Sequence, residues 1–376
     1  MRVVIASDKF KGSATGAEVA AALADGIRSV IPDAEIEAVP VADGGEGTVD
    51  AAIASGFEAV TARVAGPTGA PLDARFAVRG AEAIIEMAAA SGLDVLPRGE
   101  KAPLTATSHG TGELVSAALD RGCTTIVLGV GGSASTDGGA GMLQALGVSL
   151  RTADRPVRAG GAALADLVDV DVSGLDPRLA DAAVVLASDV DNPLLGDRGA
   201  AAVFAPQKGA SADDVVALEA GLRRFSELLE QQPGVRPAAS APGAGAAGGV
   251  GYAALAVLGA SRRPGIEVVQ RLTGLAERID GADLVITGEG SLDEQSLGGK
   301  TPMGVAAAAR AAGVPVVAVC GRTALVPEQA AAAGFAKVYP LSEIEPDPAK
   351  SIADAPALLV EIGRRIAADH VLTTAV

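Results

Sequence analysis

The sequence predicts a two-domain α/β protein, in which both ends of the chain form a parallel sheet and the middle forms an inserted α/β domain with a mixed sheet. The chain has 376 residues, which is about two domain lengths. Short apolar runs alternate with helical apolar spacing near both termini, and two strand-like runs in the middle are separated by only a few residues. We therefore expect domains at residues 1–62 with 265–376 and at residues 63–264.

The amino-terminal segment alternates strand and helix. Residues 2–6 form a short, mostly apolar run that predicts a strand. Thr15 and Glu18 have capping-box spacing, and apolar residues then recur at helical intervals, which predicts a helix. A second strand is expected over residues 35–41 and a short helix over residues 48–55.

The carboxyl-terminal segment repeats this rhythm. Strand-like runs are separated by alanine-rich helical stretches: strands are expected at 283–287, 314–320 and 337–341, and helices at about 302–312 and 325–333. Strand–helix–strand units of this kind form mostly parallel sheets. The terminal domain is therefore expected to be flavodoxin-like or Rossmann-like.

The middle of the chain has a different pattern. Strand candidates at 75–78 and 83–87 are joined by Gly80 and its neighbours, which predicts a hairpin within a mixed sheet. Alternation then resumes, with elements expected at 111–121 (helix), 125–130 (strand), 182–187 (strand) and 213–230 (helix).

The composition excludes several classes of protein. Aromatic residues supply 2% of the chain and the net charge is -16, so base stacking and attraction to nucleic acids or anionic membranes are both disfavoured. No apolar stretch approaches the length of a membrane span, and the amino terminus lacks a signal-peptide core. Cys123 and Cys320 are isolated and the only histidines are His109 and His370, which disfavours disulfides and zinc. We expect a soluble cytoplasmic protein.

The densest glycine cluster runs from Gly129 to Gly139, directly after a predicted strand. Glycines let backbone N–H groups converge on an anion, hydroxyls add donors, and the following helix start adds its positive dipole end. A turn that merely needs positive φ is the alternative. A dinucleotide interpretation, with Gly129, Gly131, Ala134 and the later Asp154, also exists, but the loop is longer than that fingerprint requires.

A second glycine cluster lies in a Pro/Ala/Gly tract between Pro233 and Gly251, which composition alone assigns to a linker. Its dinucleotide-like spacing does not follow a strand, and Ala246 stands where a ribokinase-type loop needs an aspartate. A flexible linker and a nucleotide or phosphate loop both stay open. The phosphate-loop interpretation uses Gly243, Gly245 and Gly248.

A third cluster, Gly298-Gly299-Lys300-Thr301, ends like a Walker A loop, but Glu294 occupies the opening glycine position. Lys300 nevertheless precedes Pro302, a candidate first helical residue, so an ammonium and a helix start converge there. An exposed surface lysine is the alternative.

Oxygen ligands and lysines also gather at predicted strand ends. The acids and amides with this placement are Asp43, Glu46, Asp189, Asn192, Glu289 and Asp293, and the lysines are Lys9, Lys11 and Lys208. Carboxylates there suit a hard divalent cation or a general base, although each alone is also a common turn residue. Lysines at loop tips of an acidic chain indicate an anionic substrate. A lone His109 is more typical of capping or packing.

Taken together, these segments resemble the bacterial glycerate kinase family, type I, which includes the glycerate 2-kinases. The resemblance extends from residue 6 to about residue 308. The matching stretches are DKFKGSATGAEVA, VPVADGGEGT, EMAAASGL, TSHGTGEL, GVGGSASTDGGAGMLQALG, SGLDPRL, SDVDNPLLGDRGAAAVFAPQKGA, PGAGAAGGVG and ADLVITGEGSLDEQSLGGKTPMGVA. It implies Mg²⁺-assisted, in-line transfer of the ATP γ-phosphoryl group to D-glycerate, in a cleft between two α/β domains.

On this resemblance, roles are assigned as hypotheses that could be permuted among the acids. Lys11, Lys208 and Lys300 would neutralise carboxylate and phosphate oxygens, with Asp189 as general base. Mg²⁺ ligand candidates are Asp43, Glu289 and Asp189. Substrate or phosphate would contact Asp8, Ser13, Gly131, Gly132, Ser133, Ser135, Asp137, Asn192 and Gln207, and nucleotide would contact Gly243, Gly245, Gly248 and Gly290.

Two other functions stay open from the residues: a nucleotide-linked oxidoreductase that uses the Gly129 loop, and a non-catalytic anion-binding protein. The resemblance favours phosphorylation of the 2-hydroxyl, with 3-phosphoglycerate as the alternative product. The sequence leaves the oligomeric state, the preferred phosphoryl donor and the pathway undetermined.

Overall fold

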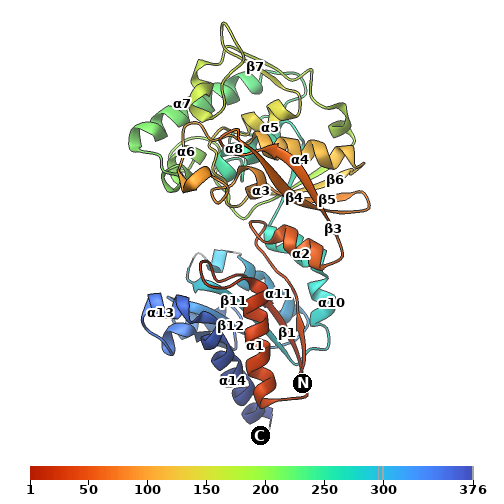
Figure 1. The fold of residues 1–376 in the computed structure, drawn as a ribbon, viewed down its shortest axis with the longest axis vertical. Helices are drawn as coiled ribbons and strands as arrows, with labels where there is room; N and C mark the ends of the chain where they lie inside the picture. Colours follow the sequence, from red (N-terminus) through yellow and green to blue (C-terminus); the bar gives the residue numbers. More distant parts are fainter. Residues whose placement is uncertain (295, 299, 375–376) are drawn as a thin grey trace. The chain divides into compact units, whose positions relative to one another are not determined.

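The computed structural model describes residues 1–294, 296–298 and 300–374. The chain packs as two compact units, and Figure 1 colours it along the sequence. We call Met1–Asp43 with Ile266–Val376 the terminal unit, and Gly44–Gly265 the inserted unit. Each unit has its own sheet and its own hydrophobic core, as expected for an α/β protein with an insertion.

The terminal unit contains a five-stranded sheet in its described part, and every strand pair is parallel. Its strands are β1 (Arg2–Ser7), β2 (Glu35–Ala38), β11 (Leu284–Leu292), β12 (Val316–Thr323) and β13 (Lys337–Pro340). The spatial order is β13-β12-β11-β1-β2. Numbered within the unit this is 2-1-3-4-5, the flavodoxin-like order, so the predicted sheet type is confirmed.

Successive side chains of each strand point to opposite faces of this sheet, and apolar side chains on both faces are covered by helices. Val3 and Ile5 of β1 pack with α1 (Gly16–Val30) and α14 (Ala355–Thr374) in one core cluster. Val4 and Ala6, which point the other way, pack with the helices of the opposite layer. The remaining helices of the unit are α9 (Gly265–Thr273), α10 (Leu275–Ile279), α11 (Thr301–Ala311), α12 (Pro327–Ala332) and α13 (Pro348–Ala353).

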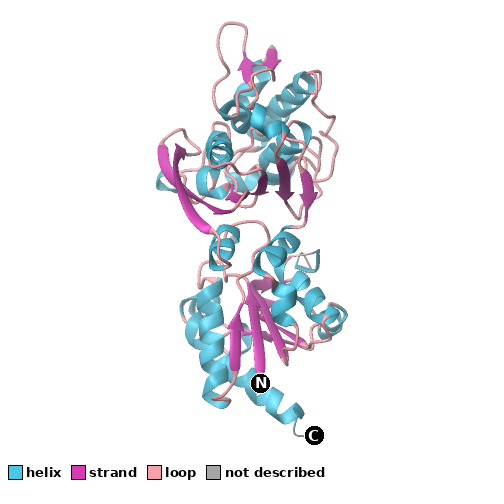
Figure 2. Cartoon of the chain, turned by 90° about the vertical axis from the view of Figure 1, so that its right-hand side faces the viewer, coloured by secondary structure: helices cyan, strands magenta, loops and turns pink. Residues whose placement is uncertain are grey.

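Local sequence signals set these helices. Thr15 caps α1, and its predicted capping box with Glu18 is present. Lys300 is the N-cap of α11, followed by a proline in the first turn, as the sequence indicated. Figure 2 shows helices on both sides of the strands of this unit.

The inserted unit contains a mixed sheet with the order β10-β9-β6-β5-β4-β3. Its strands are β3 (Glu58–Ala65), β4 (Pro71–Arg79), β5 (Glu82–Glu86), β6 (Thr125–Gly129), β9 (Ala183–Ala187) and β10 (Ser261–Arg263), with a separate hairpin of β7 (Ser149–Arg151) and β8 (Asp169–Asp171). β3, β4 and β5 are antiparallel neighbours, whereas β5, β6, β9 and β10 run parallel. The predicted hairpin around Gly80 therefore forms.

The helices of the inserted unit cover this sheet and complete its core. They are α2 (Thr48–Ala54), α3 (Ala88–Ser91), α4 (His109–Asp120), α5 (Ala140–Ala145), α6 (Ala200–Phe204), α7 (Ala212–Leu229) and α8 (Ala246–Ala256). Phe225 of α7 meets Tyr252 of α8 edge to face, with ring centroids 6.1 Å apart.

Two expectations differ from this arrangement. The unit boundary falls after Asp43, earlier than the expected 62/63, because β3 pairs along its length with β4 of the inserted sheet. The second boundary falls after Gly265, next to the expected 264/265. The flexible-linker interpretation of residues 233–251 is wrong, because α8 begins inside this tract and most of its residues from Gly243 onward are buried.

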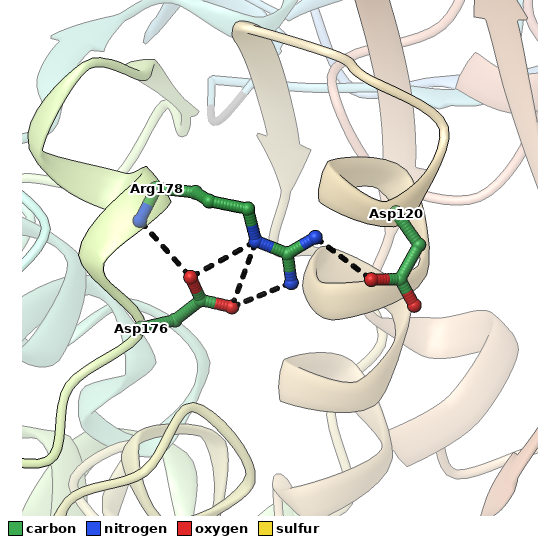
Figure 3. Close-up of polar contacts among 3 residues, drawn as sticks. All are labelled: Asp120, Asp176 and Arg178. Carbon is green, nitrogen blue, oxygen red and sulfur yellow. Dashed lines mark hydrogen bonds and ion pairs between the residues drawn. The ribbon is translucent and has the colours of Figure 1, made fainter.

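An exposed ion-pair network joins α4 to the short 3-10 helix at Pro177–Ala180 in the inserted unit (Figure 3). The Arg178 guanidinium donates to Asp176, its near neighbour, and to Asp120 at 2.8 Å. These two carboxylates raise the pKa of Arg178, with Asp176 the stronger influence. Asp120 is the last residue of α4, where a negative charge opposes the helix dipole, so Arg178 offsets that cost.

Within the part of the chain that the structure describes, no helix combines the length and the apolar composition that a membrane span requires.

Candidate active site

The terminal unit concentrates polar residues where its strand order reverses, between β1 and β11. In open α/β sheets this switch point, at the carboxyl ends of the strands, is where ligands bind. Ser7 pairs with Gly288, so Asp8 and Glu289 follow side by side on adjacent strands. The backbone N–H of Asp8 donates to Gly288 O at 2.9 Å, which fixes this register.

Asp8 is tied to the start of α11. Its Oδ2 accepts from Thr301 Oγ1 at 3.0 Å, and its Oδ1 accepts from the Lys9 backbone N–H at 2.7 Å. Burial, with the nearby charge of Asp43 as the second cause, raises the pKa of Asp8 to about 6. Asp8 and Asp43 therefore lie close enough for their negative charges to repel each other. Two carboxylates held in this way favour the binding of a cation or a proton.

Glu289 lies beside Lys300. Burial raises the pKa of the Glu289 carboxyl, and the Ser296 side chain and then the Lys300 ammonium oppose that rise. Its Oε1 is buried and accepts no hydrogen bond from any described residue. A buried carboxylate oxygen without a partner is costly, so it indicates a place for a ligand or cation. Gly299, the neighbour of Lys300 in the GGKT motif, lies outside the described residues.

Lys11, Ser13 and Gly290 occupy the same edge. Lys11 is exposed in the turn after β1, and Ser13 closes that turn through a 3.1 Å bond from its Oγ to Phe10 O. A Cβ on Gly290 would lie 3.5 Å from the Lys11 backbone N, so the two segments are neighbours. The structure thus assembles seven predicted site residues of the terminal unit at one sheet edge: Asp8, Lys11, Ser13, Asp43, Glu289, Gly290 and Lys300.

In the inserted unit, the glycine-rich loop after β6 has an accessible first part and a buried second part. Gly132 is exposed and Gly131 half-buried, and among the described residues no hydrogen bond is donated by their N–H groups or by that of Ser133. The N–H groups of Ala134, Gly138 and Gly139 donate to Ser91 O, Gly248 O and Asp137 Oδ1. Only the first part of the predicted anion loop offers donors to a ligand.

Asp137, predicted to contact substrate, is 1% exposed. Its Oδ2 accepts from the Ser108 N–H at 2.8 Å and from Ser108 Oγ at 2.9 Å, while Oδ1 accepts from the Gly139 N–H at 3.1 Å. Asp137 therefore ties the loop to the start of α4. Ser135, also predicted to contact substrate, is fully buried, and its Oγ has no partner among the described residues.

Lys208 lies beneath this loop and is 2% exposed. Its Nζ donates to Ser133 Oγ at 2.7 Å and to Ser135 O. Burial lowers the pKa of Lys208 to about 7, and the charge of Asp137 opposes that shift. The neighbouring Gln207 is exposed, and its backbone carbonyl accepts from Lys101 Nζ at 2.9 Å.

The second glycine cluster packs against the first. A Cβ on Gly248 would lie 2.1 Å from Ser135 O, and one on Gly245 would lie 2.3 Å from Pro193 O. Ala247, Gly248 and Gly249 have consecutive positive φ angles of 55°, 68° and 97°. Close backbone approach therefore requires Gly245 and Gly248, and a φ of 87° favours glycine at Gly243, whether or not these residues also contact nucleotide.

Asp189 and Asn192 lie in the loop after β9. Asp189 Oδ1 accepts from the Gly265 N–H at 2.8 Å, and Asn192 Nδ2 donates to Arg198 O at 2.7 Å. The Asn192 carbonyl accepts from the Gly245 N–H at 2.8 Å, which joins this loop to the second glycine cluster. Asp189 is half-buried, so one face of its carboxylate can reach solvent.

Sequence reasoning missed three residues that organise these sites. Thr301 bonds to Asp8, Ser108 bonds to Asp137, and Glu86 accepts from the N–H groups of Gly47 and Val49 at 2.9 and 2.6 Å. Burial raises the pKa of Glu86 to about 6. The signal was present for Ser108, since it precedes His109 in a noted motif, whereas His109 itself only approaches Glu113, at 3.7 Å.

A flavodoxin-like sheet with acids and lysines at its switch point, joined to a unit with a glycine-rich loop after a parallel strand, is typical of α/β proteins that act on small ligands. The comparisons with known proteins make this specific. A model described as the glycerate kinase family matches residues 3–371, and the chain therefore belongs to the glycerate kinase family.

Named relatives agree with this assignment. The chain is 48% identical over 325 residues to a glycerate 2-kinase of Escherichia coli K12, covering 85% of each chain. It is 46% identical over 325 residues to a glycerate kinase of Bacillus subtilis 168, again covering 85% of each. The crystal structure of a "putative glycerate kinase 2" from Salmonella typhimurium LT2 matches with a TM-score of 0.84 and 40% identity, covering 100% of both chains. The protein is accordingly a kinase with an alcohol group as phosphoryl acceptor.

Proposed function

We propose that this protein transfers the γ-phosphoryl group of ATP to the 2-hydroxyl of D-glycerate in a Mg²⁺-assisted, in-line reaction. One observation carries the proposal: Asp8, Glu289 and Lys300 come from three separate segments and lie together at the carboxyl ends of β1 and β11, where the strand order reverses. Family membership supports glycerate as the substrate, and a relative named glycerate 2-kinase supports the 2-hydroxyl as the position of transfer.

Phosphoryl transfer requires positioning and charge neutralisation rather than covalent catalysis. Lys11 and Lys300 would neutralise phosphate or carboxylate oxygens, because both lie at the edge where Asp8 and Glu289 end their strands. Gly131, Gly132 and Ser133 would bind a further anionic group through their N–H donors. Asp189 would accept the proton of the attacking hydroxyl. Since these residues belong to both units, the proposal requires both to engage the substrates, and closure would exclude water.

The residues present fit Mg²⁺. Among the described residues, no three His, Cys, Asp or Glu side chains converge on one point that could hold a metal ion. Mg²⁺ needs fewer protein ligands, because it keeps several waters and commonly binds one or two carboxylates plus substrate phosphates. The Asp43 carboxylate and the unpartnered Oε1 of Glu289 would hold it. Bound there, Mg²⁺ would supply positive charge that offsets the negative charge developing during phosphoryl transfer.

The test is a coupled assay of ADP release from ATP and Mg²⁺ with D-glycerate, with the product identified by ³¹P NMR. A 2-phosphoglycerate signal is the expected result. A 3-phosphoglycerate signal would support the kinase activity but would overturn the 2-hydroxyl as the position of transfer. Absence of glycerate-dependent ADP from folded protein, with L-glycerate and other triphosphates also tried, would overturn the proposal.

Two variants test the acids. Glu289→Gln and Asp189→Asn should each lower kcat on the order of 10²- to 10³-fold, as expected when a charged group acting on the transition state is lost. Glu294→Gln is the matched control, because Glu294 is an exposed acid in the same segment as Glu289. Near wild-type turnover in a folded Asp189→Asn variant would remove Asp189 as the base.

A cytoplasmic location and the absence of nucleic-acid and membrane partners are part of the same proposal, and they rest on the composition and the net charge of -16. Binding of NADH, detected by fluorescence quenching, would revive the oxidoreductase alternative, which the family assignment gives no reason to retain.

A further inference from the structure

The lysine predicted to neutralise substrate charge by contact lies out of reach of any ligand in this structure. Lys208 is 2% exposed, and its Nζ donates to Ser133 Oγ and Ser135 O within its own unit. A buried ammonium is expensive unless its hydrogen bonds are made, so its retention under a glycine-rich loop requires an explanation.

Both partners lie just beyond the point, between Gly132 and Ser133, where the loop passes from accessible to buried. Gly131 and Gly132 precede Ser133 and reach solvent, whereas Ser135 to Asp137 are at most 1% exposed. On the buried side, Gly248 and Asp137 hold the chain through bonds to Gly138 and Ser108. Next to the accessible glycines, Lys208 bonds the side chain of Ser133, which is 6% exposed, while backbone bonds link Gly132 O to Leu93 and Ala134 N to Ser91.

We propose that Lys208 is a positioning residue that fixes Gly131 to Ser133 in the shape that binds an oxyanion, and that its charge attracts the anion through the loop without touching it. This inference rests on the proposed function in taking the anion to be a carboxylate of glycerate or a phosphate of the nucleotide. Both present the same chemistry to three backbone N–H donors.

The electrostatics agree with this geometry. The charged group acting on Lys208 is Asp137, and Ser133 and Ser135 are neutral. Lys101 lies against Gly209 on the adjacent turn but directs its Nζ to Gln207 O. An anion bound at Gly131 to Ser133 therefore favours the protonated form of Lys208.

The experiment compares Lys208→Met with Lys101→Met in the full-length protein. Lys101→Met is the matched control, because it removes an exposed ammonium bonded to the same turn without emptying a buried position. Calorimetry measures the affinity for D-glycerate alone and for ADP alone. Lys208→Met should bind either D-glycerate or ADP about 10- to 100-fold more weakly than wild type, which is the effect of losing a charged hydrogen-bonding group. Lys101→Met should bind both ligands within about twofold of wild type.

A purely structural lysine would not change the protons exchanged on binding. Near pH 7.5, titrations in buffers of different ionisation enthalpy should show more proton uptake when the affected anion binds to wild type than when it binds to Lys208→Met. Folded Lys208→Met with wild-type affinity for both anions, or with unchanged proton uptake, would overturn the inference.

If Lys208→Met does not fold, Ser133→Ala supplies the decisive variant, because it removes one acceptor of Lys208 and leaves the ammonium in place. The same anion should then bind several-fold more weakly, and unchanged affinity for both would overturn the inference. Failure of the proposed function alone would give a different result. Wild type would bind an anion more tightly than Lys208→Met does, yet it would release no ADP from ATP in the presence of D-glycerate.

Discussion

The two units differ in how far their polar residues beside glycines are exposed to solvent. At the switch point of the terminal unit, Asp8, Lys9, Glu289 and Lys300 are half-buried and keep access to solvent. In the glycine-rich loop of the inserted unit, Ser135, Thr136 and Asp137 are at most 1% exposed, and the lysine below them is 2% exposed. The difference shows that an acid or lysine beside glycines marks either a contact surface or the support beneath one, and burial decides which.

The largest expected effect is a loss of stability on replacing a glycine. We compare one predicted nucleotide-binding glycine from each unit. Gly248→Ala places a Cβ 2.1 Å from a backbone oxygen at a φ of +68°, so the unfolding free energy should fall by about 3 kcal/mol or more. Gly290→Ala meets only ordinary contacts at 3.5 Å and should cost about 1 kcal/mol or less. Urea denaturation measures both.

If Gly290 also lies against nucleotide, Gly290→Ala should raise KM for ATP while stability is retained. Equal destabilisation by the two substitutions would contradict the contrast drawn between the units.

The next effect concerns the buried ammonium. Because the pKa of Lys208 falls from 10.5 to about 7 on folding, the unfolded chain binds more protons between these values, and stability rises with pH there. From pH 7 to 9, the unfolding free energy of wild type should increase by about 2 kcal/mol relative to that of Lys208→Met. Denaturation at several pH values checks this, and parallel profiles for the two proteins would show that Lys208 is not desolvated in solution.

A smaller effect tests the strained turn at the start of α8. The non-glycine residues with positive φ in the described chain are Arg98 and Ala247, and both lie in the inserted unit. Ala247→Gly should raise the unfolding free energy by about 0.5 kcal/mol, because relief of left-handed strain exceeds the entropy cost of glycine. Ala253→Gly, within the regular part of the same helix, should instead lower it by about 1 kcal/mol. A loss of stability in both variants would argue against strain at Ala247.

The smallest effect is expected for the network of Figure 3. Asp120→Asn removes one partner of an exposed guanidinium that Asp176 still holds, and water and salt screen such pairs. The thermal midpoint should therefore move only slightly, and less at high salt than at low salt. A large shift that persists at high salt would show that α4 depends on this contact.

Much of the fold could be read from the sequence because local patterns determine it. The capping box at Thr15, the βαβ rhythm of both ends and the hairpin at Gly80 each depend on residues close together in the chain. The motif resemblance likewise indicated the family, which the match over residues 3–371 confirms. Residues 233–251 could not be read in this way, since glycines needed for close packing have the composition of a flexible linker.

By itself, the sequence determined the α/β class, the parallel terminal sheet, the family and the residue types that a kinase site needs. Only the tertiary structure decided which of them are buried and which reach solvent. Asp8 meets Thr301 across 293 positions and Lys208 meets Ser133 across 75, and neither contact has a local signature. The physical reason is that exposure and pKa depend on what packs around a side chain, and residues distant in sequence supply that packing.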